Sequence, residues 1–230
     1  MSARFPCVNK TSLPERKTVT HASIALPTCQ LLRQLRCALG ALALLLLAAG
    51  GATHRFMGSA NTERSAKLVR LAGEGNIADV QRMIDAGMPV EATNITGATA
   101  LMAAALNGRN ETLHFLLKNK ANAAARERFG HTALMLAAKN GNMENISLLL
   151  RAAEKTGTAT ATINASNQHG ATALTFAAIH GHTDIARALL DAGARPTIRD
   201  RFGVLPLQRA ERAGHTEIAP LLRETENNGK

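Results

Sequence analysis

Histidine, cysteine and carboxylate side chains are the groups in this sequence that could carry catalysis or bind a metal. The nearest approach to a metal-binding pair is His180-x-His182, and the fragment Gly73-Glu-Gly75 lacks the remainder of a dinucleotide-binding loop. The cysteines, Cys7, Cys29 and Cys37, all lie in the first 37 residues, so the rest of the chain offers no thiol nucleophile and no thiolate metal site. The motifs of serine hydrolases, zinc proteases and P-loop proteins are absent from the sequence. We therefore expect no catalytic residues, no metal site and no cofactor.

Two short segments combine phenylalanine with arginine, namely Arg126-Glu-Arg-Phe129 and Arg199-Asp-Arg-Phe202. Aromatic residues make up only 3% of the chain, without Trp or Tyr, so these two positions stand out. An exposed Phe flanked by Arg is typical of the anchor residues of protein interfaces. In the alternative interpretation, each Phe packs against a neighbouring segment and each Arg is a solvated charge.

The spacing of glycines identifies the elements that must position these segments. One series consists of Gly75, Gly108, Gly141, Gly181 and Gly214, with spacings of 33, 33, 40 and 33 residues. A second consists of Gly97, Gly130, Gly170 and Gly203, with spacings of 33, 40 and 33 residues. Both series lengthen by the same 7 residues in the same interval, which indicates an internal repeat with one insertion between Leu150 and Gly170.

Each repeat unit contains small and large apolar positions that predict two helices. Alanine pairs such as Ala137–Ala138 follow the second-series glycines, and large apolar pairs such as Leu149–Leu150 follow the first-series glycines. The small residues let the first helices approach closely, and the large residues pack against neighbouring units, because no unit can bury its apolar face alone. The sequence thus predicts an all-α solenoid of about five helix-turn-helix units with short β-turn fingers.

The repeat resembles the ankyrin repeat. Its period, the Thr-Ala-Leu triplets at 99–101, 132–134 and 172–174, Gly-His-Thr at 181–183 and Asp-Ala-Gly-Ala at 191–194 are similar to the family pattern over about residues 61–223. The resemblance implies that His182 and His215 occupy the family's turn position. The last unit departs from the pattern, with Leu205 in place of Thr and Pro220 inside its second helix, as expected of a terminal cap.

The resemblance also implies the domain organisation. We expect a basic, disordered leader at 1–36, a hydrophobic signal or anchor segment at 37–53, the ankyrin repeat domain at 61–223 and a disordered tail at 224–230. The expected units lie at about 62–94, 95–127, 128–167, 168–200 and 201–223. The third unit holds the insertion, which we expect to lengthen one helix end and its loop.

In ankyrin proteins, recognition uses the loop tips and the exposed ends of the first helices, which line a concave face. The tip positions in this chain are Ile95, Thr96, Arg128, Phe129, His131, Gln168, His169, Arg201 and Phe202. The helix-end positions are Leu106, Asn107, Lys139, Asn140, Ile179, His180 and Arg212. Because these positions are apolar and mildly basic, we expect a partner protein with an acidic and partly apolar patch.

The positive charge of the chain lies mainly ahead of the repeats. Residues 1–60 contain 7 Lys/Arg and one acid, a net charge of +6, whereas residues 61–230 contain 20 Lys/Arg and 16 acids, a net charge of +4. The repeats also lack the interleaved aromatic residues on which single-stranded bases stack. The sequence therefore gives no support for a nucleic-acid partner.

A hydrophobic run at 37–52 reads CALGALALLLLAAGGA and follows Arg33 and Arg36. The basic flank, the apolar run and the small residues that close it are typical of a secretory signal. The run of 16 residues is shorter than the roughly 20 that a membrane-spanning helix needs, which favours cleavage and a periplasmic or secreted protein. The alternative is an uncleaved signal anchor in the inner membrane, in which residues 37–53 alone contact the membrane.

The residues ahead of this run are too many for an ordinary signal peptide, and two explanations are open. Translation could start later, near Val19, Leu31 or Leu32, in a bacterial protein. Alternatively, residues 1–36, rich in Arg, Ser and Thr, could form a mitochondrial-type presequence.

These features together predict a non-enzymatic protein-binding module that acts outside the cytoplasm. We expect an accessory or protective factor for a periplasmic enzyme. The alternatives are an inhibitor or immunity-type protein that neutralises a toxic enzyme, and a membrane-anchored scaffold.

The signal segment leads to a prediction about the mature chain. Cleavage after Ala52 would give a mature protein that begins near Thr53, because small residues at the end of the apolar run fit signal peptidase. N-terminal sequencing of the protein from its native source tests this. Recovery of Met1 in a soluble cytosolic fraction would contradict export.

Overall fold

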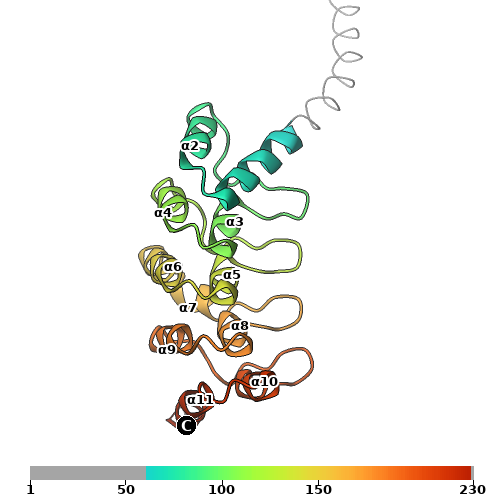
Figure 1. Ribbon diagram of the computed structural model, residues 1–230, viewed down its shortest axis with the longest axis vertical. Coiled ribbons are helices and arrows are strands. Elements are labelled where there is room, and N and C mark those ends of the chain that lie inside the picture. The colour runs from blue at the N-terminus through green and yellow to red at the C-terminus, as the bar shows by residue number, and fades with distance from the viewer. Residues whose placement is uncertain (1–60, 229–230) are drawn as a thin grey trace, which may run out of the picture. The chain divides into compact units, whose positions relative to one another are not determined.

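The computed structural model describes residues 61–228, with side-chain exposure described to residue 224 (Figure 1). The predicted leader and the hydrophobic segment at 37–53 lie outside the described residues. Among the residues that are described, no helix is long and apolar enough to cross a membrane.

The described chain folds into successive helix pairs, as the repeat pattern predicts. A helix over residues 61–74 is followed by α2 (Ile77–Asp85), α3 (Ala100–Leu106), α4 (Asn110–Lys118), α5 (Ala133–Asn140), α6 (Met143–Lys155), α7 (Ala159–Ile163), α8 (Ala173–Ile179), α9 (Thr183–Asp191), α10 (Pro206–Ala213) and α11 (Ala219–Asn228). Between residues 61 and 228 there is no β-strand, and a single bridge joins Thr93 to Thr99. The predicted all-α solenoid is confirmed.

The helices form two layers (Figure 1). The first helices of successive units, α3, α5, α8 and α10, pack directly on one another, and the second helices form the outer layer beside them. Alanine pairs such as Ala104–Ala105 and Ala177–Ala178 are fully buried in the inner layer. Because an alanine side chain is a single methyl group, these pairs permit the short distance between neighbouring helices that the stack requires.

Threonine begins the inner helices. Thr99, Thr132 and Thr172 are the N-cap residues of α3, α5 and α8, and each hydroxyl accepts the backbone N–H three residues later at 3.3–3.4 Å. This hydrogen bond satisfies one of the backbone donors that a helix leaves free at its start. The Thr of each Thr-Ala-Leu triplet therefore fixes the point where the chain turns from finger into helix.

The final unit shows how a departure from the repeat pattern is accommodated. Leu205 replaces the capping Thr, and its backbone N–H donates instead to Oε1 of Gln208 at 3.1 Å. Pro220 lies at the second position of α11, where a backbone N–H would have no partner within the helix. Pro220 therefore lies inside the second helix of the unit, as predicted, but in its first turn, because the helix begins at Ala219.

The insertion builds more than a longer helix end and loop. Helix α6 has 13 residues, whereas α4 and α9 have 9 each, so the expected lengthening is present. The additional helix α7 was not predicted from the sequence, because its Thr-rich composition has weak helix propensity. Burial of Thr162 and Ile163 against the array holds this short helix in place.

The outer layer contains unpartnered polar residues at one core position of the repeat, Thr112 in α4 and Asn145 in α6. Asn145 in α6 is fully buried, and neither atom of its amide group has a hydrogen-bond partner in the described chain. Ile185 and Ile218 occupy the same position of the next two units and are buried as well. A buried amide without partners loses its hydration and gains nothing in return.

Replacing Asn145 by the residue of the later units should therefore stabilise the array. We expect Asn145→Ile to raise the free energy of unfolding by about 1–2 kcal/mol, since it removes an unpaired polar group and adds apolar burial. Urea unfolding followed by circular dichroism measures the change. Asn119→Ile, at an exposed site that ends α4, is the control and should give no gain. An unchanged or lower midpoint for Asn145→Ile would show that the amide is satisfied in solution.

Candidate functional site

Four fingers project from the inner layer, and their tips span residues 94–98, 127–131, 167–171 and 200–204 (Figure 1). In three of them the first residue is Asn or Asp, and its side-chain oxygen accepts two backbone N–H groups at 2.9–3.0 Å. The donors lie two and four residues later: Thr96 and Ala98 for Asn94, His169 and Ala171 for Asn167, and Phe202 and Val204 for Asp200. This local hydrogen bonding closes each tip into a defined turn.

Backbone hydrogen bonds also join each finger to the next. Arg128 N–H donates to Thr96 O, Gln168 N–H to Phe129 O, and Arg201 N–H to His169 O, each at 2.9 Å. At this contact Gly170 has a φ of +74°, and a Cβ atom there would lie 2.8 Å from the backbone nitrogen of Arg201. All four second-series glycines have a positive φ, and at Gly170 the close approach of the next finger excludes a side chain as well.

The apolar tip residues lie exposed on this rigid frame. Ile95 is 76% exposed, Phe129 is 50% exposed and Phe202 is 69% exposed. The guanidinium carbons of Arg201 and Arg209 lie 5.6 and 5.7 Å from the centre of the Phe202 ring. Phe202 thus contacts two guanidinium groups, and most of its surface faces solvent.

The carboxylates of Glu127 and Asp200 form hydrogen bonds within their own fingers. Burial raises the pKa of Glu127, but hydrogen bonds from the backbone of Phe129 and His131 and from the His131 ring bring it below its usual value. Burial likewise raises the pKa of Asp200, but the backbone of Val204, the Arg209 side chain and the backbone of Phe202 lower it overall. Both side chains are therefore ionised at neutral pH, and both are already engaged in hydrogen bonds within the finger.

His131 is the predicted tip residue that the structure turns inward. It is half-buried, its Nδ1 lies 2.6 Å from Glu127 Oε1 and its Nε2 lies 3.1 Å from Asn167 Nδ2. Its ring also contacts Phe176 with 5.7 Å between the ring centres. His131 therefore links two fingers to the inner helices, a role that its position in the repeat did not indicate.

The remaining predicted residues lie at the opposite ends of the inner helices. Leu106, Asn107, Lys139, Asn140, His180 and Arg212 are exposed, and Ile179 is half-buried. An inner helix of 7 or 8 residues separates each of them from its finger, a length of about 10–12 Å. The structure thus places the predicted residues in two rows, one along the finger tips and one along the helix ends.

His180 of the row of helix ends, and His182 beside it, contact other residues of the array. His182 lies over the turn of the preceding unit, where a Cβ atom on Gly141 would come within 2.6 Å of the imidazole. The His180 ring stacks on His182 with 6.1 Å between centres, and burial together with the charges of His182, Lys139 and His215 lowers the pKa of His180. Among the described residues, no three His, Cys or acidic side chains are grouped as metal ligands.

Stacked helix pairs, backbone-linked fingers and exposed tip side chains define a solenoid of the class that binds other proteins. The family model for ankyrin repeats matches residues 68–159 and 156–230, and this chain belongs to the ankyrin repeat family. Ankyrin repeats are protein–protein interaction modules, so protein binding is the general function of the array.

One curated relative is similar over most of the array. A protein named mitochondrial disaggregase from Bos taurus is 28% identical over 165 residues, which cover 72% of this chain and 23% of the relative. The chain therefore spans less than a quarter of that relative's length.

The contact between Asp200 and Arg209 leads to a pH-dependent prediction. The Asp200 side chain is 4% exposed, and its Oδ2 accepts from Arg209 Nε at 2.7 Å and pairs with Nη2 of the same residue. Because the pKa of Asp200 is lowered on folding, its stabilising contribution is present above the unfolded value of 3.8 and is lost as pH falls through the folded value. Asp200→Asn should cost about 1–2 kcal/mol at pH 7.

Thermal unfolding from pH 7 to pH 2.5 measures both effects. The variant should lose stability at pH 7 and approach the wild type as the pH falls below 3.8, because the protonated wild-type side chain no longer pairs with Arg209. Asp184→Asn, an exposed carboxylate on α9, serves as the control and should follow the wild-type curve. Parallel curves for Asp200→Asn and the wild type would contradict the lowered pKa.

Proposed function

We propose that this chain is a non-enzymatic binding protein that acts outside the cytoplasm and holds a partner protein on its finger face. The finger face consists of the exposed tip residues Ile95, Phe129, Phe202, Arg128 and Arg201. The observation that carries the proposal is the chain of backbone hydrogen bonds between fingers, since it presents these side chains in fixed positions. A preorganised surface loses little conformational entropy when a partner binds.

The charge of the finger face supports an acidic, partly apolar partner. Arg128 and Arg201 are exposed and form no ion pair among the described residues, whereas the neighbouring carboxylates Glu127 and Asp200 are engaged by His131 and Arg209. The tips therefore combine exposed Phe with guanidinium groups that form no ion pair among the described residues. Such a surface attracts carboxylates at its rim and buries apolar groups at its centre.

A periplasmic location and an accessory role for a periplasmic enzyme are parts of this proposal. The hydrophobic run at 37–52 behind Arg33 and Arg36 supports export. A repeat array without cysteine suits an oxidising compartment, because it cannot form incorrect disulfides. The absence of recognisable catalytic motifs favours binding as the activity of the chain itself.

The bovine relative favours a second candidate function. Because it is named a disaggregase, the shared array could bind unfolded or aggregated proteins rather than one native enzyme. The shared segment is 23% of that protein, so disaggregation itself is not assigned to this chain. Binding that is stronger to heat-denatured proteins than to any native partner would favour this candidate.

The finger face is tested by removing both aromatic anchors. Phe129→Ala with Phe202→Ala should weaken partner binding by about 2–4 kcal/mol, since truncated aromatic anchors commonly lose that much. The melting temperature should change little, because both rings are largely exposed. The partner is first captured from the native compartment with the wild-type chain, identified by mass spectrometry and then titrated with each variant.

A matched control keeps this test specific. Met143 is 45% exposed on the outer helix α6, so Met143→Ala removes an exposed apolar side chain away from the fingers and should leave binding intact. A double Phe variant with lowered stability and unchanged binding would show that the rings serve the fold and that the partner binds elsewhere.

A further inference from the structure

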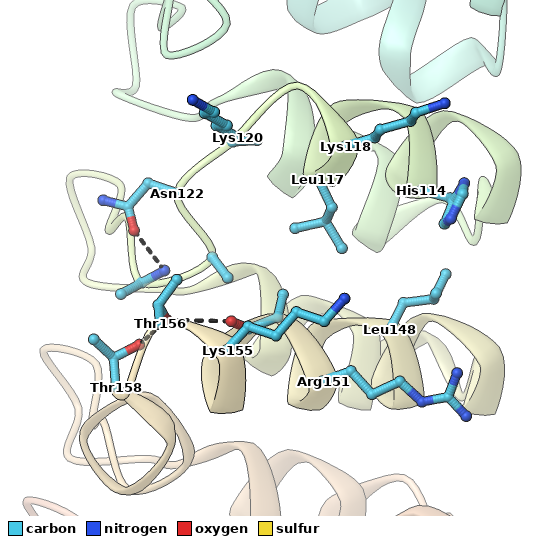
Figure 2. Close-up of a pocket in the computed structure, with 14 residues that line it drawn as sticks. His114, Leu117, Lys118, Lys120, Asn122, Leu148, Arg151, Lys155, Thr156 and Thr158 are labelled. Atoms are coloured by element: carbon cyan, nitrogen blue, oxygen red, sulfur yellow. Dashed lines mark hydrogen bonds between the residues drawn. The ribbon is translucent and has the colours of Figure 1, made fainter.

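The outer layer contains a hollow that the finger face does not use. It lies between α4 and α6, has a volume of about 700 Å³ and extends to Thr158, the residue that precedes α7 (Figure 2). Leu117 of α4 and Leu148 of α6 point into it from opposite sides, and both are only half-buried. The floor of this outer groove is therefore apolar and accessible to solvent.

Four cationic side chains surround the outer groove. Lys118 and Lys120 come from the α4 side, and Arg151 and Lys155 come from α6 (Figure 2). All four are exposed, none forms an ion pair within the described chain, and no Asp or Glu lines the hollow. Glu91 reaches only its edge, where it accepts the backbone N–H of Asn122 at 2.7 Å. The rim thus has an uncompensated positive charge.

The four cations come together at one place in the array, and the extension of α6 by the insertion contributes Lys155 to them. In the repeat register, Arg151 corresponds to Lys118 in the preceding unit and to Asp191 in the following one. Lys155 belongs to the last turn of α6, which extends beyond the point where α4 and α9 end. Neighbouring helix pairs therefore do not reproduce the same row of cations.

We propose that the outer groove is a second docking surface and binds an acidic peptide segment of a partner protein. Leucine-like side chains of the segment insert between Leu117 and Leu148, while its Asp and Glu residues pair with the four cations on the rim. Apolar insertion supplies most of the binding free energy, and the charges select and orient the segment.

The composition of the groove disfavours other occupants. No Phe, Tyr or Trp lines it, so it provides no aromatic platform for nucleic-acid bases. Its leucines lie in a hollow rather than on a protruding surface, so they could not insert into a membrane. Residues 1–60 of the chain carry a net charge of +6 and would be repelled by the rim, so the occupant is a segment of another protein.

The test uses synthetic peptides and the purified full chain. The probe is a fluorescein-labelled 12-residue peptide of alternating Glu and Leu pairs, and binding is followed by fluorescence anisotropy. One control peptide has Gln in place of Glu, and another has Ser in place of Leu. We expect the Glu/Leu peptide to bind and both control peptides to bind about tenfold more weakly or not at all.

Variants locate the binding on the molecule. Lys118→Gln with Arg151→Gln should weaken peptide binding at least about tenfold, because each removes a charge from the rim without touching the core. Arg187→Gln with Arg195→Gln removes the same charge from exposed positions outside the groove and should leave binding unchanged. Phe129→Ala with Phe202→Ala should also leave it unchanged, which separates this surface from the finger face.

Three results would overturn the proposal. They are failure of the Glu/Leu peptide to bind, equal loss in the two charge-removal variants, and a preference for a single-stranded oligonucleotide or for phosphatidylserine vesicles that the groove variant abolishes. The last would assign the groove to another class of ligand. Melting temperatures of both variants within about 2 °C of the wild type exclude unfolding as the cause of a loss.

Discussion

The contact between each glycine turn and the polar residue that begins the next outer helix sets the spacing of the entire array. A Cβ atom on the first-series glycine of the preceding unit would lie 2.4–2.6 Å from the rings of His182 and His215, and 3.0–3.1 Å from the side chains of Arg109 and Asn142. Asn142 also donates to Gly108 O at 3.4 Å, and Arg109 donates to Gly73 O at 3.1 Å. Because this contact recurs between successive units, each unit sits at a fixed distance and orientation on its neighbour. The fingers can form their own backbone hydrogen bonds only at that spacing.

Most of the fold could be predicted because it repeats. A glycine, an alanine pair or a threonine cap that recurs at one period leaves a signal in the sequence that a single occurrence would not leave. Helix α7 could not be predicted, because it occurs once and is held by tertiary burial of Ile163 rather than by local propensity. The place of Pro220 within its helix could not be predicted either, because it depends on where α11 begins, and α11 begins at Ala219.

The candidate site was predictable in its positions and not in its contacts. The repeat register identified which residues lie at the finger tips and helix ends, and the structure exposes most of them. It could not show that His131 bridges Glu127 and Asn167, because His131 and Asn167 are 36 residues apart in the sequence and meet only when the fingers lie side by side. The register also did not show which arginine forms an ion pair: Arg209 pairs with Asp200, whereas Arg201 contacts the Phe202 ring. The outer groove was missed because a hollow between helices has no periodic sequence signal.

The third unit concentrates the departures from a regular repeat. It contains the unpartnered amide of Asn145, the extended α6 and two of the cations that line the outer groove. The next two units place isoleucine at the position of Asn145, whereas the preceding unit has Thr112, and the outer helix of the following unit ends one turn earlier. Departures from the stabilising pattern are expected where a protein has a functional site, because binding surfaces tolerate unpaired charges and exposed apolar groups that the rest of the fold avoids. Repulsion among the four neighbouring cations of the outer groove destabilises the array. An acidic segment bound in the groove would remove this repulsion. Asn145, the extended α6 and the cations of the outer groove all belong to the outer layer. The finger face therefore keeps its regular hydrogen bonds between fingers.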